Sequence, residues 1–153
     1  MTNRQLVLET MKRAGRLIAR NIQNNAAGMS GTELNAEADY IPGFTAACAR
    51  MNMLDRPIGF VCSSTAGRVV KLIQPYDSAI FPQEPEELPA QWGFQWSTDP
   101  AKALPFVALA TSPYNTGDCC TYDGHVWRSG QDGNVWAPGT VNISWEDLGA
   151  VST

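Results

Sequence analysis

The stretch from Ser112 to Gly149 constrains the fold of this chain more than any other part of its sequence. It is dense in aromatic residues, glycine and aspartate, and nearly free of lysine and arginine. Two short alternating runs, 118–122 and 125–129, flank the dipeptide Asp123-Gly124. Because both central positions of a tight hairpin turn need positive φ, an Asp-Gly pair between alternating runs predicts a β-hairpin.

Large aromatic rings are expected to close the small sheet around this hairpin. A unit this short has little aliphatic core, so rings must supply most of its buried area. Ring convergence and the turn glycines together predict a module core of Tyr114, Gly117, Gly124, Trp127 and Trp145.

The order of these residues resembles a known family, the carbohydrate-binding modules of families 5 and 12, also called chitin-binding type 3 domains. The resemblance lies in Tyr114-x-x-Gly117-Asp118-x-Cys120-x-Tyr122-x-Gly124-x-x-Trp127, followed by Pro138-Gly139 and Trp145. It covers about a quarter of the chain. It implies a small three-stranded antiparallel unit that holds cellulose or chitin on exposed aromatic rings.

The stretch departs from that family where sugar is bound. Family members carry an aromatic pair soon after the second strand, whereas residues 128–132 contain no ring. Trp136 is then the remaining stacking platform, and the alternative for its ring is a structural or subunit contact. The candidate carbohydrate-binding residues are Trp136, Asn134, Asp132 and Tyr122.

An amphipathic helix is predicted over residues 4–25, the only long helical pattern in the chain. Its apolar stripe recurs at spacings of three and four, as Val7, Met11, Ala14, Ile18 and Ile22. Another face carries Arg13, Arg16 and Arg20. Because an isolated helix of this length is marginal in water, the stripe needs a partner. That partner is either the chain's own β modules or neighbouring copies in a small bundle.

An internal repeat is indicated by two glycines and a tryptophan that recur in order. The first copy has Gly59, Gly67 and Trp92, and the second has Gly117, Gly124 and Trp145. The predicted fold is therefore α+β and mainly β, a helix followed by two small antiparallel β modules. The expected segments are a helix at 1–28, a linker with an irregular apolar segment at 29–56, a first module with connector at 57–111 and a second module at 112–153.

The connector between the modules is expected to pack in the groove between them. Its residues 101–109 are largely apolar, and Pro100 and Pro105 exclude a long helix there. Packed in this way, the connector would fix the orientation of one module relative to the other.

The composition bounds the class of protein. A hydrophobic content of 44% and a charged content of 17% are typical of a folded chain. No run of eighteen apolar residues is present, so no membrane span is predicted. The four cysteines have neither zinc-finger spacing nor the density of a disulfide scaffold, which favours a reducing cytoplasm. The net charge of −4 and the absence of aromatics among the arginines argue against a nucleic-acid partner.

Groups able to carry out catalysis are sparse. His125 is the only histidine, and a hairpin tip offers it no buried orienting partner. Nothing places two carboxylates across a cleft, and the chain has no glycine-rich phosphate loop. We therefore expect no enzyme activity, no catalytic residue, no metal and no cofactor.

The whole layout is also similar to small structural proteins of tailed bacteriophages. The segments that carry this second resemblance are Tyr40-Ile41-Pro42-x-Phe44, Leu72 to Tyr76, Trp96 to Pro100, and Ser112-Pro113-Tyr114. It implies a virion protein made in the host cytoplasm without an export signal: a capsid decoration, fibre, tail or baseplate component. Its expected partners are other copies of itself, other virion proteins and host-surface polysaccharide. The alternative is a stand-alone chitin- or cellulose-binding module, or an accessory part of a glycoside hydrolase.

Overall fold

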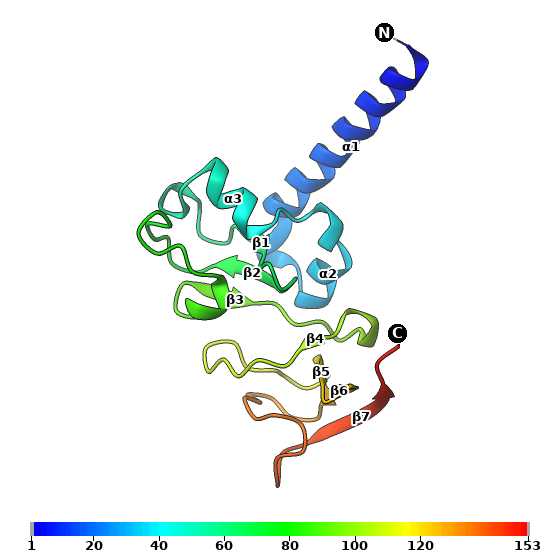
Figure 1. Cartoon of the computed structure of the whole chain (residues 1–153), viewed down its shortest axis with the longest axis vertical. Helices are drawn as coiled ribbons and strands as arrows, with labels where there is room; N and C mark the ends of the chain where they lie inside the picture. Colours follow the sequence, from blue (N-terminus) through cyan, green and yellow to red (C-terminus); the bar gives the residue numbers. More distant parts are fainter. Residues whose placement is uncertain (1, 153) are drawn as a thin grey trace.

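A long helix projects from a body that contains two small β-sheets (Figure 1). The computed structural model describes residues 2–152. The helix, α1, spans Asn3–Asn25 and begins with a capping box between Thr2 and Gln5. Two short helices, α2 (Gly31–Ala36) and α3 (Phe44–Arg50), follow it.

The first sheet is antiparallel and the second is mixed. The first has the order β1 (Val61–Ser63), β2 (Val69–Leu72), β3 (Trp92–Phe94). The second has the order β4 (Leu104–Pro105), β5 (Cys119–Tyr122), β6 (His125–Ser129), β7 (Trp145–Ala150). The predicted class, α+β and mainly β with a helix and two small β modules, is confirmed. The second module is not antiparallel throughout, because β4 pairs with β5 in parallel.

The two sheets have equivalent backbone hydrogen bonds at the positions of the predicted repeat. Gly59 N donates to Leu72 O at 2.7 Å, and Gly117 N donates to Ser129 O at 2.8 Å. Both glycines have a positive φ, 91° and 96°, which explains why glycine recurs at this position.

Equivalent bonds also close each meander just before its tryptophan. Ile73 N donates to Gln91 O, and Gly130 N donates to Ser144 O. In each module a parallel segment also flanks the first strand. Gly43 forms a parallel bridge with Ser63 in the first module, and β4 fills this place in the second.

The first core is centred on Trp92, which is fully buried. Its ring meets Phe44 and Tyr76 edge to face at 5.9 and 6.1 Å, and its Nε1 donates to Tyr76 Oη at 3.1 Å. Buried Ala47 and Met53 complete this side of the cluster.

Residues 29–56 are part of the first module and not the linker expected from the sequence. Leu34 in α2, Phe44 and Ala47 in α3, and Met53 are all buried. Each of these short helices buries only one or two apolar side chains, too few to produce a periodic pattern. The expected boundary at residue 28 also divides a packed cluster, because Ile22 and Ala26 pack with Leu34, Val61 and Val69.

Aromatic stacking joins the two modules. The Trp96 ring lies 4.3 Å from that of Tyr114, nearly parallel to it, and its Nε1 donates to Ser112 O at 2.9 Å. The connector contacts both modules. Leu104 pairs with β5, whereas Leu109 is buried in the first core.

Gln23 covers the outer edge of β1. Its Nε2 donates to Val61 O at 2.7 Å, and Val61 N donates to its Oε1 at 2.9 Å. Replacing Gln23 with alanine leaves both backbone groups of a buried residue without partners. We expect Gln23→Ala to lower the free energy of unfolding by about 1–3 kcal/mol.

Urea unfolding followed by tryptophan fluorescence, at fixed protein concentration, measures this loss. Asn24→Ala is the matched control, because Asn24 is exposed on the same turn and surface changes usually stay within about 0.5 kcal/mol. Equal losses in the two variants would contradict a structural role for the Gln23 amide.

Candidate functional site

The N-terminal half of α1 stands clear of the body and is nevertheless apolar (Figure 1). Val7 and Met11 are 56% and 64% exposed, and Leu6 and Leu17 are 57% and 56% exposed. Large exposed apolar patches on folded proteins mark interaction sites. This part of α1 is therefore the strongest candidate for a functional surface.

The predicted stripe divides into a free part and a packed part. Val7, Met11 and Ala14 are exposed, and Ile18 is half-buried against the body. Ile22 is buried among side chains of its own chain. Of the two partners that the sequence left open for the stripe, Ile22 has its own chain and not a second copy, because the last turns of α1 close the first module.

The C-terminal end of α1 is fixed to the body. The Gln23 amide bonds to both backbone groups of Val61, and Ile22 and Ala26 fill the core beneath the helix. The direction in which the free half projects is thus set by buried contacts and hydrogen bonds.

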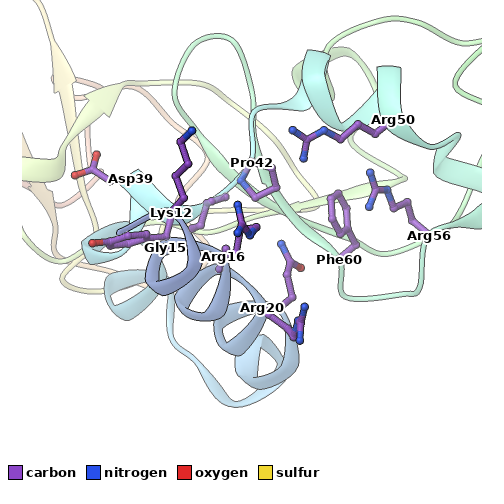
Figure 2. A pocket seen from close by; sticks show the side chains of 13 residues that line it. Lys12, Gly15, Arg16, Arg20, Asp39, Pro42, Arg50, Arg56 and Phe60 are labelled. Carbon is purple, nitrogen blue, oxygen red and sulfur yellow. The ribbon is translucent and has the colours of Figure 1, made fainter. Parts of the chain in front are cut away.

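A basic groove of about 580 Å³ lies between α1 and the body. Figure 2 shows its lining: Lys12, Arg16 and Arg20 come from α1, and Arg50 and Arg56 come from the opposite wall. The aromatic residues Tyr40 and Phe60 also line it, and Asp39 is its only acid. Of the three arginines that the sequence places on another face of the helix, Arg16 and Arg20 line the groove and Arg13 does not.

Most of the groove's positive charge is unneutralised. Within residues 2–152, Lys12 is the only groove side chain in an ion pair, 3.9 Å from Glu9. Arg56 lies 4.3 Å above the Phe60 ring and donates from Nη2 to Ala47 O, while its buried Nε has no partner. A groove of this kind attracts carboxylates or phosphates.

The candidate sugar-binding residues do not form a single platform. Trp136 is 46% exposed and Tyr122 is 42% exposed, but no ring pair within residues 2–152 includes Trp136. Tyr122 packs its ring edge-on to Phe106 at 6.1 Å. Asp132 is exposed and accepts a hydrogen bond from Thr116 N at 2.9 Å.

Asn134 is fully buried, so its prediction as a sugar contact is wrong. Its Nδ2 donates to Ser129 Oγ at 3.1 Å, and its Oδ1 accepts from Trp136 N at 3.2 Å. Its backbone exchanges two hydrogen bonds with Tyr114. The side chain is buried because it forms hydrogen bonds with Ser129 Oγ and with the backbone N–H of Trp136, which are not paired by the strands of the small sheet.

The residues of the predicted module core differ in how deeply the structure buries them. Tyr114 is buried, and Trp145 meets its ring at 5.5 Å while remaining half-buried. Gly117 and Gly124 occupy positive-φ turns. Trp127 is less central than expected, because it is half-buried and its one ring pair within residues 2–152 is with His125.

The groups with reactive chemistry are dispersed. His125 Nδ1 lies 2.9 Å from Asp147 Oδ1, and this hydrogen bond lowers the pKa of Asp147. Burial raises the pKa of the Cys62 thiol, and it raises that of Cys120 to about 12, so both stay protonated at neutral pH. Within residues 2–152, no group of three metal-ligating side chains is assembled.

Comparison of the chain with protein-family models, with curated proteins and with solved structures finds no match. Within residues 2–152, none of the helices combines the length and the apolar character needed to cross a bilayer.

Proposed function

We propose that this chain is a non-enzymatic structural component of a virion of the tailed-bacteriophage kind. It self-associates through the free half of α1 and displays its β modules outward, as a capsid decoration, fibre, tail or baseplate element. The single observation that carries the proposal is the row of exposed apolar side chains on that projecting helix.

Two features favour a second copy as the partner of the stripe. Its residues recur in steps of four, three and four from Val7 to Ile18, which is the spacing of a helical bundle seam. The free half of α1 also makes few contacts that would keep it helical by itself. Its capping box and its local hydrogen bonds stabilise the helix only weakly compared with the free energy that forming an isolated helix in water costs. Neighbouring helices of the same kind would supply the missing burial.

The virion assignment is supported by where the resembling segments lie. Trp96 and Ser112 form the joint between the modules, and Phe44 and Tyr76 surround Trp92 in the first core. The segments that resemble phage structural proteins therefore include residues that build the first core and the joint between the modules. This supports applying the resemblance to the two-module body and not to one isolated motif.

A second candidate function is polysaccharide binding, which the exposed ring of Trp136 favours. One ring can stack on one sugar, but no neighbouring exposed ring extends the platform in the part of the chain that the structure describes. We place it second for this reason. Adhesion to host glycans would in any case use the displayed module and not α1.

The test is the mass in solution of the intact chain and of a variant lacking residues 2–14. The deletion stops before Ile18, because that side chain packs on the body. We expect the intact chain to have a mass well above the 16.6 kDa of one copy, the shortened chain to be monomeric, and neither to bind insoluble chitin or cellulose. A monomeric intact chain that binds chitin, and loses binding on Trp136→Ala, would overturn the proposal in favour of the second candidate.

A further inference from the structure

The basic groove continues past α1 along the body. A second hollow of about 460 Å³ lies against α3 and shares four lining residues with the groove: Pro42, Arg50, Arg56 and Phe60. Figure 2 shows Arg50 and Arg56 together on the wall opposite α1. The groove and this hollow therefore form one elongated basic trough, with two arginines where they join. A trough of this shape suits an extended chain better than a compact ligand.

Cations line the α1 side of the trough at regular intervals. Lys12, Arg16 and Arg20 recur every four residues, so their Cα atoms lie about 6 Å apart along the helix axis. Within residues 2–152, Asp39 is the one acid that lines the groove, and it lies at the end away from the arginines of the opposite wall (Figure 2). Five cations and one acid give the groove a net charge of +4. A single carboxylate cannot neutralise this charge, whereas a polyanion can.

The cations of the trough favour phosphate as the anion. Four of the five groove cations are arginines, whose planar fork matches phosphate oxygens with two parallel hydrogen bonds. Arg56 is also held in place by its own chain, because it lies 4.3 Å above the Phe60 ring and its Nη2 donates to Ala47 O at 2.9 Å. A guanidinium fixed in this way loses little side-chain entropy when an anion binds.

One exposed aromatic ring lies beside these cations. Tyr40 is 41% exposed and lines the groove with Lys12 and Arg16. Proteins that hold single strands combine a positively charged groove with aromatic rings, because every base has a flat face that can stack on a ring. An acidic peptide has no comparable series of flat rings along its length. The ring of Tyr40 therefore favours nucleic acid over a carboxylate-bearing chain.

Folding changes the two sequence features that argued against a nucleic-acid partner. The chain has a net charge of −4, but the groove has a local charge of +4. The arginines of α1 have no aromatic residue among them in the sequence, but Tyr40 lies beside them in the groove. We propose that the basic trough binds single-stranded nucleic acid, with phosphates on its arginines and one base stacked on Tyr40.

This inference goes beyond the structural role proposed above and does not rest on self-association. At 100° per residue, Arg16 and Arg20 lie about 160° around α1 from the centre of the apolar stripe. Association through the stripe therefore leaves the trough open. All the residues that line the trough also belong to one chain. Nucleic-acid binding and self-association can thus succeed or fail separately.

Fluorescence anisotropy of a labelled single-stranded DNA 12-mer tests the trough at low salt. We expect the unmodified chain to bind the DNA, and Arg16→Ala/Arg20→Ala to bind it at least about tenfold more weakly. The matched control is Arg13→Ala/Lys102→Ala, which removes two exposed cations that do not line the trough. This control should bind about as tightly as the unmodified chain. Absence of binding, or equal weakening of the two variants, would overturn the proposal.

The salt dependence of binding counts the phosphate contacts. For a single strand, the slope of log K against log salt concentration changes by about 0.7 for each phosphate that a cation neutralises. We expect this slope to be shallower by about 1.4 in Arg16→Ala/Arg20→Ala and unchanged in the control variant. An unchanged slope in Arg16→Ala/Arg20→Ala would contradict phosphate contacts in the trough and would overturn the proposal.

Two substitutions of Tyr40 test the stacked base. Tyr40→Ala should weaken DNA binding about tenfold, because it removes the stacking surface. Tyr40→Phe keeps the ring and should bind as the unmodified chain does. Inorganic polyphosphate has no bases, so its binding should be the same in Tyr40→Ala and in the unmodified chain. Undiminished DNA binding by Tyr40→Ala would overturn the proposal, since the trough would then take phosphates without bases.

Competition separates nucleic acid from the other polyanion that the trough could take. Unlabelled DNA should displace the labelled 12-mer at a much lower concentration of charge than poly-L-glutamate does. Equal displacement by poly-L-glutamate would overturn the proposal in favour of an acidic protein segment. A monomeric chain that binds DNA as described would defeat only the self-association proposed above, and an oligomer that binds no DNA would defeat only this inference.

Discussion

The double variant Val7→Asp/Met11→Asp is expected to be a monomer of about 16.6 kDa at concentrations where the unmodified chain is an oligomer. Both side chains lie on the stripe and are more than half exposed in the single chain. Carboxylates at a helix–helix seam must be desolvated without partners, which costs several kcal/mol. Since each 1.4 kcal/mol is a factor of ten, association should weaken by at least about 100-fold.

The chain offers a closely matched control for this experiment. Leu6 and Leu17 are as exposed as Val7, but they lie about 100° or more around the helix from the centre of the stripe. Leu6→Asp/Leu17→Asp introduces the same two charges and at least as large a loss of helix propensity, because leucine is a better helix former than valine. Light scattering behind size exclusion measures the masses, and near-UV circular dichroism checks that the body is intact. Equal dissociation of both variants would show that the free half of α1 has no defined seam.

The second large effect concerns the paired tryptophans of the two modules. We expect Trp92→Ala to lower the free energy of unfolding by about 3–5 kcal/mol, a large share of the roughly 5–15 kcal/mol typical of a domain. Trp92 is fully buried between Phe44 and Tyr76. Trp145 occupies the equivalent place in the second module but is half-buried. Trp145→Ala should therefore cost clearly less.

Urea unfolding at fixed protein concentration compares the two variants. If Trp92→Ala does not fold, Trp92→Phe gives a smaller, measurable loss, because it removes the hydrogen bond to Tyr76 and part of the ring volume. A larger loss from Trp145→Ala than from Trp92→Ala would show that the second sheet holds the body together, contrary to the burial of these two rings.

The predictions from sequence that the structure contradicts concern residues whose burial is set by neighbours from other parts of the chain. Asn134 resembles a surface residue in a polar loop, yet it is buried because Ser129 and the backbone of Trp136 need its amide. Ile22 continues the stripe of α1 by spacing, yet it faces its own core. Nothing in the local sequence distinguishes Ile22 from Met11, because the difference lies in what the body places beside each.

The basic groove also could not be predicted from the sequence. A net charge of −4 is a sum over the whole chain and carries no information on position. The groove gathers Arg50 and Arg56 beside the arginines of α1, although about thirty residues separate the two sets. Folding therefore produces a local field of opposite sign to the net charge of the protein.

By itself the sequence determined the elements that depend on near neighbours. It determined the long helix, through its 3.6-residue period, and the hairpin at Asp123-Gly124. It also determined the repeat, because Gly59 and Gly117 hold backbone angles that side chains oppose. Only the tertiary structure decided which part of the helix stays free, which polar groups are buried and where charge collects. The physical reason is that φ preference and periodicity act within a few residues, whereas burial and electrostatic potential depend on segments brought together from distant parts of the chain.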